Sequence, residues 1–260
     1  MHIAQAKPGS FCWFELATSN QAAAKEFYGG LFGWTAIDSP MGPDAFYTIF
    51  ELQGQKVGAA YSLMPDQCQQ GVPPHWGTYV CVTNVDEAVS RAKNLGATVL
   101  AEPMDVMDHG RMAVLRDPTE AVISLWQPKQ HQGVSLLAEV GAFGWSELLT
   151  RDTATATSFY TGLFGWKTHV GDGTGVPYTH WQNDGADIGG MMAIMEQWGP
   201  MPACWVNYVQ VKDCDATLAK AESLGGKICM PPMDIPNTGR FAMLQDPQGA
   251  SLSVIALTSK

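Results

Sequence analysis

Basic side chains are scarce in this chain of 260 residues, where 15 lysines and arginines stand against 25 aspartates and glutamates. The formal net charge is -10, and no stretch gathers lysine or arginine into a cluster. Because phosphate binding depends on clustered basic side chains, this composition excludes a nucleic-acid partner. Long apolar runs are also missing, and the first residues, MHIAQAKPGS, lack the apolar core of a signal peptide. We therefore expect no membrane partner.

Cysteine is sparse and scattered, and no two cysteines form a CxxC pair. Zinc knuckles need such closely spaced ligands, and disulfide frameworks belong mainly to small secreted domains. The pattern favours reduced thiols and a cytoplasmic location. The six cysteines are Cys12, Cys68, Cys81, Cys204, Cys214 and Cys229.

An internal repeat organises what is present. Residues 9–34 and 141–166 agree at more than half of their positions. The first segment ends in FYGGLFGW and the second in FYTGLFGW. Later segments match as well: GRMAVLRDPTEA at 110–121 corresponds to GRFAMLQDPQGA at 239–250. Repeats of this length indicate homologous domains rather than a single fold. We expect one domain over 8–128, a linker over 129–138 and a second domain over 139–258.

Within each copy the residue pattern predicts a strand, a helix and three strands, and then the same order again. Residues 11–18 alternate as a strand, and a helix follows over 19–33 with Ser19 or Asn20 as its N-cap. The fold class is therefore α+β, with four βαβββ units forming two domains. Each domain is expected to be a curved mixed sheet with helices on its outer face and a bowl on its inner face. The glycine-rich residues 171–177 predict a hairpin or a loop rather than a phosphate-binding site.

The order of elements resembles the vicinal oxygen chelate superfamily, which includes glyoxalase I, bleomycin-resistance proteins and extradiol dioxygenases. The resemblance rests on FYxxLFGW after the first helix of each copy, LGA or LGG after the second helix, and GR with DP near each end. It covers nearly the whole chain and is closest to bacterial tandem-domain proteins described as glyoxalase-like. It implies the fold and a small-molecule partner, but one scaffold of this kind hosts many reactions.

In enzymes of that superfamily, His, Gln or Glu side chains of the first and last strands of each unit hold a divalent metal in the bowl. Alignment on the shared motifs places Trp13 and Trp145 at first-strand positions, with Ser124 and Ser253 at last-strand positions. None of these is a ligand that a catalytic metal prefers. We therefore predict no metal and no cofactor, with a divalent metal at another site as the alternative. The remaining aligned positions are Gly77 or Thr78, Val206 or Asn207, Ala60 or Tyr61, and Met191 or Met192.

The strand FCWFEL at 11–16 carries a carboxylate among apolar residues. Alternation predicts that Phe11, Trp13 and Glu15 share one face, and FGWSEL at 143–148 repeats the arrangement with Trp145 and Glu147. A buried carboxylate must be paired, protonated or turned toward a wet cavity. Two interpretations are open. Arg111 and Arg240 could pair with the glutamates structurally, or Glu15 and Glu147 could act as general bases or ligand-orienting groups.

Aromatic and methionine side chains are expected to line both bowls, which suits a planar or apolar small molecule. The copies differ at three of these positions: Tyr61 against Met192, Thr78 against Asn207, and Ile49 against His180. The predicted ligand-binding residues are Trp13, Tyr61, Trp76, Thr78, Arg111, Trp145, His180, Met192, Trp205, Asn207 and Arg240.

Three functions fit these observations. The leading hypothesis is a cytoplasmic protein that binds a small aromatic or apolar molecule without a metal centre, as the resemblance to bleomycin-resistance proteins implies. The second is an enzyme, a lyase, isomerase or dioxygenase-like member that uses Glu15, Glu147 or another metal site. The third is an interaction scaffold whose bowls are filled by its own side chains. The chain is expected to be a two-domain monomer or a homodimer.

Overall fold

The computed structural model describes residues 1–42, 45–171 and 177–258, and within them the four predicted βαβββ units are confirmed. The predicted loop at 171–177 lies mostly outside the described residues. The first unit comprises β1 (Phe11–Thr18), α1 (Gln21–Phe32), β2 (Thr35–Pro40), β3 (Phe46–Leu52) and β4 (Gln55–Ser62). After the short helix α2 (Pro65–Gln69), the second unit comprises β5 (His75–Cys81), α3 (Val85–Asn94), β6 (Thr98–Val106), β7 (Gly110–Arg116) and β8 (Val122–Pro128).

The second half repeats this order. Its first unit comprises β9 (Phe143–Thr150), α4 (Thr153–Phe164), β10 (Lys167–Val170), β11 (Tyr178–Asn183) and β12 (Ala186–Ala193). A single turn of 3-10 helix, η1 (Glu196–Trp198), leads to β13 (Cys204–Gln210), α5 (Cys214–Ser223), β14 (Lys227–Ile235), β15 (Gly239–Gln245) and β16 (Ser251–Leu257). No helix among the described residues is long and apolar enough to cross a membrane.

Each half forms one mixed sheet of eight strands, in the orders β2-β3-β4-β1-β5-β8-β7-β6 and β10-β11-β12-β9-β13-β16-β15-β14. The first strands of the two units are antiparallel neighbours at the centre, as β1 and β5 are in the first sheet. The helices begin where the sequence provides caps. The side chain of Asn20, not Ser19, accepts a hydrogen bond from the backbone N–H of Ala23 at 3.1 Å.

The two faces of each sheet have different roles. We call the face that carries Trp13 and Glu15, and Trp145 and Glu147 in the second half, the bowl face. The helices cover the opposite face. Phe11 does not share the bowl face as predicted, because a β-bulge between Phe11 and Trp13 breaks the alternation of β1.

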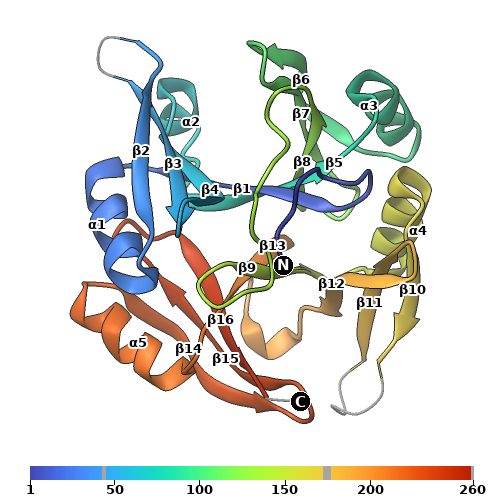
Figure 1. Ribbon diagram of the computed structural model, residues 1–260. Helices are drawn as coiled ribbons and strands as arrows, with labels where there is room; N and C mark the ends of the chain where they lie inside the picture. Colours follow the sequence, from blue (N-terminus) through green and yellow to red (C-terminus); the bar gives the residue numbers. More distant parts are fainter. Residues whose placement is uncertain (43–44, 172–176, 259–260) are drawn as a thin grey trace.

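The helix-covered faces of the two sheets pack against each other. Phe14 of β1 stacks on Phe143 of β9 with ring centroids 4.1 Å apart. Helix α1 lies beside α5 and α3 lies beside α4, so helices of both halves flank the contact (Figure 1). The Tyr28 hydroxyl of α1 donates a hydrogen bond to Asp246 of the other half at 3.0 Å. Because the helix faces meet, the two bowls open on opposite sides of the molecule.

Candidate functional site

The carboxylate of Glu15 is held by two tyrosines on the bowl face of the first sheet. The hydroxyl of Tyr47 donates to one carboxylate oxygen at 2.5 Å, and the hydroxyl of Tyr79 donates to the other at 2.6 Å. Tyr47 also accepts a hydrogen bond from the indole N–H of Trp13 at 2.8 Å. Side chains of β1, β3 and β5 therefore form one hydrogen-bonded network, which we call the polar group of the bowl. Its members are Trp13, Glu15, Tyr47 and Tyr79.

The second sheet builds the same group. The hydroxyl of Tyr178 donates to Glu147 at 2.7 Å and accepts from the indole N–H of Trp145 at 2.8 Å. Tyr208 donates to the other carboxylate oxygen at 3.1 Å. Two copies of the same Trp–Tyr–Glu–Tyr arrangement show how each domain accommodates the carboxylate that the sequence places on its first strand.

The electrostatics of both glutamates are dominated by burial. Burial raises the pKa of Glu15 and of Glu147 above the ordinary glutamate value, and the hydrogen bonds from the tyrosines only partly oppose this rise. Burial and the nearby carboxylate also raise the pKa values of Tyr47 and Tyr178 well above the ordinary tyrosine value, so both hydroxyls remain donors at neutral pH. A carboxyl group with a raised pKa in a recess can accept a proton from a bound molecule.

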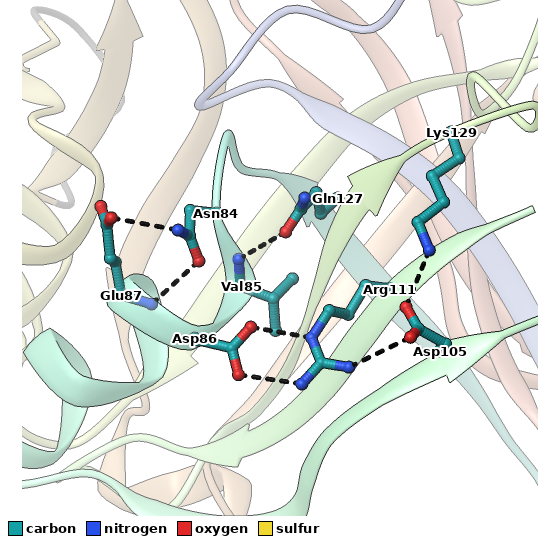
Figure 2. A network of polar contacts seen from close by, with 8 residues as sticks. All are labelled: Asn84, Val85, Asp86, Glu87, Asp105, Arg111, Gln127 and Lys129. Atoms are coloured by element: carbon teal, nitrogen blue, oxygen red, sulfur yellow. Dashed lines mark hydrogen bonds and ion pairs between the residues drawn. The ribbon is translucent and has the colours of Figure 1, made fainter.

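The predicted pairing of arginine with glutamate is wrong. Arg111 of β7 instead pairs with Asp86 of α3, through Nε at 2.8 Å and Nη2 at 2.9 Å, as Figure 2 shows. It also lies 3.6 Å from Asp105. Arg240 makes the equivalent contacts with Asp215 and Asp234. Both arginines tie a helix N-terminus to a strand, so neither contacts the bowl glutamates.

Four further predicted ligand-binding residues lie on the helix-covered face, because they alternate with the bowl residues along their strands. Trp76 donates its indole N–H to Tyr28 of α1, and Trp205 donates to Tyr160 of α4, both at 2.9 Å. Thr78 and Asn207 meet across the contact between the sheets, where the Asn207 amide donates to the Thr78 hydroxyl at 2.8 Å. These side chains hold the two halves together and do not line a bowl.

The positions that the resemblance aligns with metal ligands form a row across the centre of each sheet. In the first sheet, register places Tyr79, rather than Gly77 or Thr78, between Trp13 and Ser124. In the second sheet, Tyr208 lies between Trp145 and Ser253. An indole, a phenol and a hydroxyl are poor ligands for a divalent metal, and the adjacent glutamate oxygens are occupied by tyrosines. The side chains of these rows therefore do not fit a metal centre of the superfamily type.

The first bowl is covered by the linker. His131 lies with its ring centroid 4.3 Å from that of Trp13 and 5.6 Å from that of Trp126. Its carbonyl accepts the indole N–H of Trp126 at 2.9 Å, and the linker is fixed to β1 by a hydrogen bond from Val134 to Cys12 at 2.8 Å. Burial lowers the pKa of His131 to about 4. As a result only 3% of Trp13 is exposed.

The second bowl has no such cover among the described residues. Trp145 is half-buried and belongs to an apolar cluster separate from the main core. Met192 of β12 packs against this cluster. The equivalent residue of the first half is Tyr61 of β4, whose hydroxyl accepts a hydrogen bond from Gln67 at 3.1 Å. The cluster consists of Leu149, Ile194, Val206 and Tyr208, with Trp145, Met192, Met201, Cys204, Phe241, Met243 and Ile255 packed around them.

A surface hollow of about 440 Å³ adjoins this cluster. It is lined by Thr119 and Glu120 of the first half and by residues 150–152 and 201–203 of the second. Met201 belongs both to the lining of the hollow and to the cluster, so the two lie next to each other. His180 lies at the other side of the same bowl, with ring centroids 5.9 Å from Trp145 and 5.1 Å from Tyr178.

Comparisons with known proteins agree with this fold. A family model described as the Glyoxalase/Bleomycin resistance protein/Dioxygenase superfamily matches residues 10–125 and 142–254. The chain belongs to this superfamily. It is 40% identical over 255 residues to "Putative glyoxylase CFP32" of Mycobacterium tuberculosis, covering 96% of this chain and 95% of that protein. It is 34% identical over 261 residues to "Anthracycline biosynthesis protein DnrV" of Streptomyces peucetius, covering 96% and 94% of the two chains.

Solved structures of more distant superfamily members share the fold. The Mn(II)-bound glyoxalase from Novosphingobium aromaticivorans has a TM-score of 0.64 at 14% identity, covering 96% of this chain and 83% of its own. The 2,3-dioxygenase LapB from Pseudomonas sp. KL28 has a TM-score of 0.65 at 10% identity, covering 98% and 94%. At these identities the likeness concerns the fold alone.

Several residues of the site were not identified from the sequence. Tyr47 and Tyr178 precede a threonine in both copies, as FYT and PYT, so the repeat contained a signal for them. His131 had no such signal, because it lies in the linker and has no counterpart in a repeated motif.

Proposed function

We propose that this protein binds a small, flat and largely apolar organic molecule in the bowl of its second domain, without a metal centre of the superfamily type. The observation that carries the proposal is the apolar cluster around Trp145, which is separate from the main core: its centre is buried, and Trp145 at its margin is half-buried. Exposed apolar surface with a few convergent polar groups is typical of small-molecule sites. The first bowl lacks this surface because His131 lies over Trp13.

The polar group of the second bowl is suited to orienting a ligand. Glu147 is buried, and its oxygens already accept hydrogen bonds from Tyr178 and Tyr208. The hydroxyls of these tyrosines can in turn accept a hydrogen bond from a ligand hydroxyl or amine, so the group can orient a ligand without displacing the Glu147 contacts. Trp145, Phe241 and Met243 provide flat or polarizable surfaces against which an aromatic ring can stack.

The names of relatives support this ligand class. An anthracycline contains a flat anthraquinone ring system, and DnrV is named for anthracycline biosynthesis. The name of CFP32 instead points to a glyoxylase-type reaction. The second candidate function is therefore an enzyme of the superfamily in which Glu147 accepts a proton from the bound molecule, a role that its raised pKa favours.

Fluorescence titration with a hydroxyanthraquinone, a naphthol and a monocyclic phenol tests the proposal. We expect saturable quenching by the fused-ring compounds, and loss of most of that quenching in Trp145→Phe but not in the matched variant Trp13→Phe. Replacing the carboxyl group by an amide in Glu147→Gln should weaken binding by up to about tenfold, since one hydrogen bond contributes about 0.5–1.5 kcal/mol. Quenching that persists in Trp145→Phe and disappears in Trp13→Phe would place the ligand in the first bowl and contradict the proposal.

The same variants separate binding from catalysis. If a compound that binds is also converted, Glu147→Gln should abolish conversion while retaining weakened binding. Conversion at the wild-type rate in Glu147→Gln would eliminate Glu147 as the base.

A further inference from the structure

We infer that His169, His180 and Asp187 form a binding site for one divalent transition-metal ion at the rim of the second bowl. The three residues come from the neighbouring strands β10, β11 and β12, and His169 lies directly opposite His180 in the register. Their potential ligand atoms all lie within 4.8 Å of one another. This position is distinct from the Trp145–Tyr208–Ser253 row, where related enzymes hold their metal.

The geometry brings both imidazoles to one carboxylate. Oδ1 of Asp187 lies 3.0 Å from Nε2 of His169, and Oδ2 lies 3.4 Å from Nδ1 of His180. The two imidazole rings stack with centroids 4.6 Å apart and planes inclined by 8°. Gly171 leaves room for this arrangement, because an added Cβ there would lie 2.8 Å from Nε2 of His180.

One nitrogen in this group lacks a partner. Nδ1 of His180 is shielded from solvent but makes no hydrogen bond within the described part of the chain. Its separation of 3.4 Å from Asp187 is close enough for both atoms to bind one ion after a small rotation of either side chain. A buried polar atom without a partner is unfavourable, and coordination of an ion would satisfy it.

The first domain provides an internal comparison. Ile37 lies opposite Ile49 in its register, at the positions of His169 and His180. Lys56 is the equivalent of Asp187, because Lys56 pairs with Glu51 in the first sheet as Asp187 pairs with Gln182 in the second. The same sheet edge therefore forms with two isoleucines and a lysine, so folding does not require the histidines and the aspartate. All three potential ligands occur together only in the domain whose bowl is uncovered.

The chemistry of the three groups defines the ion. Two imidazoles and one carboxylate suit Zn²⁺, Ni²⁺, Co²⁺ or Cu²⁺ rather than Mg²⁺ or Ca²⁺, which prefer oxygen ligands. Three protein ligands leave at least one coordination position for water or for an oxygen of a molecule in the bowl. His180 faces that space beside Trp145 and Tyr178.

Titration of the chelator-treated full-length protein with NiCl2 and CoCl2 by calorimetry tests the inference without any organic ligand, so its outcome is independent of the proposed function. The exposed Cys68 and Cys229 are first replaced by serine, which removes thiolates that could bind either ion. We expect one ion per chain with a micromolar Kd, weakened at least tenfold in His169→Ala, His180→Ala and Asp187→Asn. The matched control His75→Ala, on the bowl face of the first domain, should leave the Kd unchanged.

A variant that carries the first domain's residues, His169→Ile, His180→Ile and Asp187→Lys, guards against loss of folding, since that combination is already compatible with this fold. It should keep its thermal unfolding temperature but bind no ion. The absorption bands of bound Co²⁺ should be those of nitrogen and oxygen ligands. Absence of stoichiometric binding, or undiminished binding by this triple variant, would overturn the inference.

Discussion

Tyr47 and Tyr178 occupy the same place in the two domains, and each joins a tryptophan to a glutamate through a single hydroxyl. Each hydroxyl accepts the indole N–H at 2.8 Å and donates to the carboxylate. Because Glu15 and Glu147 have no arginine partner within the described part of the chain, these tyrosines are what stabilise a carboxylate on the bowl face.

Removing this hydroxyl should destabilise either domain. Tyr178→Phe leaves the Trp145 N–H and one oxygen of Glu147 without their partner, and an unsatisfied buried group costs about 1–3 kcal/mol. Urea unfolding should show a loss of that size, and Tyr47→Phe should show a similar loss in the first domain. A loss below about 0.3 kcal/mol in both variants would contradict the role given to the hydroxyl.

The stability conferred by Glu147 should depend on pH. Since burial raises its folded-state pKa above the unfolded value, the folded protein favours the protonated form. Wild-type protein should therefore lose stability relative to Glu147→Gln as the pH rises from 4 through the folded pKa. A tenfold difference in proton affinity corresponds to about 1.4 kcal/mol. Unfolding curves of both proteins at pH 4 and pH 8 provide the measurement, and a constant difference between them would refute the assignment.

His131 should produce the opposite pH dependence. Burial lowers its pKa to about 4, so its neutral form stabilises the linker over the first bowl at pH values above about 6.5. That contribution should decrease by about 3 kcal/mol as the pH falls from 7 to 4, and the decrease should be absent in His131→Gln. Acrylamide quenching should also find Trp13 more accessible in His131→Ala, whereas His109→Ala serves as the control. Unchanged quenching would mean that His131 does not cover the bowl.

Gly190 should be required for the second site. An added Cβ at Gly190 would overlap the hydroxyl of Tyr178, so Gly190→Ala should displace the tyrosine from Glu147 and cost about 1–3 kcal/mol. The first domain has Ala59 at this position opposite its glutamate, and Ala59→Gly should leave the Tyr47 contact intact. Crystal structures of both variants would show which hydrogen bonds remain. Retention of the Tyr178–Glu147 bond in Gly190→Ala would contradict this expectation.

The fold could be predicted from the internal repeat and from the spacing of apolar residues. Each domain carries the same local signals, such as FYxxLFGW, and its strands and helices form where these signals predict them. The alternation of β1 also placed Trp13 and Glu15 correctly on one face. Phe11 was misplaced because a β-bulge leaves no mark in an otherwise regular pattern.

The site itself was predicted less well. Trp76, Thr78, Trp205 and Asn207 were assigned to the bowls, but a strand buried on both faces gives no alternation from which to distinguish them. The partners of Arg111 were also missed, since ion pairs with Asp86 and Asp105 depend on how strands and a helix meet in space. The cover over the first bowl depends on the path of the linker, which no local propensity determines.

The central claim is that the second bowl, and not the first, receives a flat organic molecule beside Trp145. The most direct measurement is fluorine NMR of protein labelled with 5-fluorotryptophan. Among the nine tryptophans, the resonances of Trp13 and Trp145 are assigned from their loss in Trp13→Phe and Trp145→Phe. Addition of a hydroxyanthraquinone should shift the Trp145 resonance in a saturable way and leave that of Trp13 unchanged. A saturable shift of Trp13 with none at Trp145 would contradict the account.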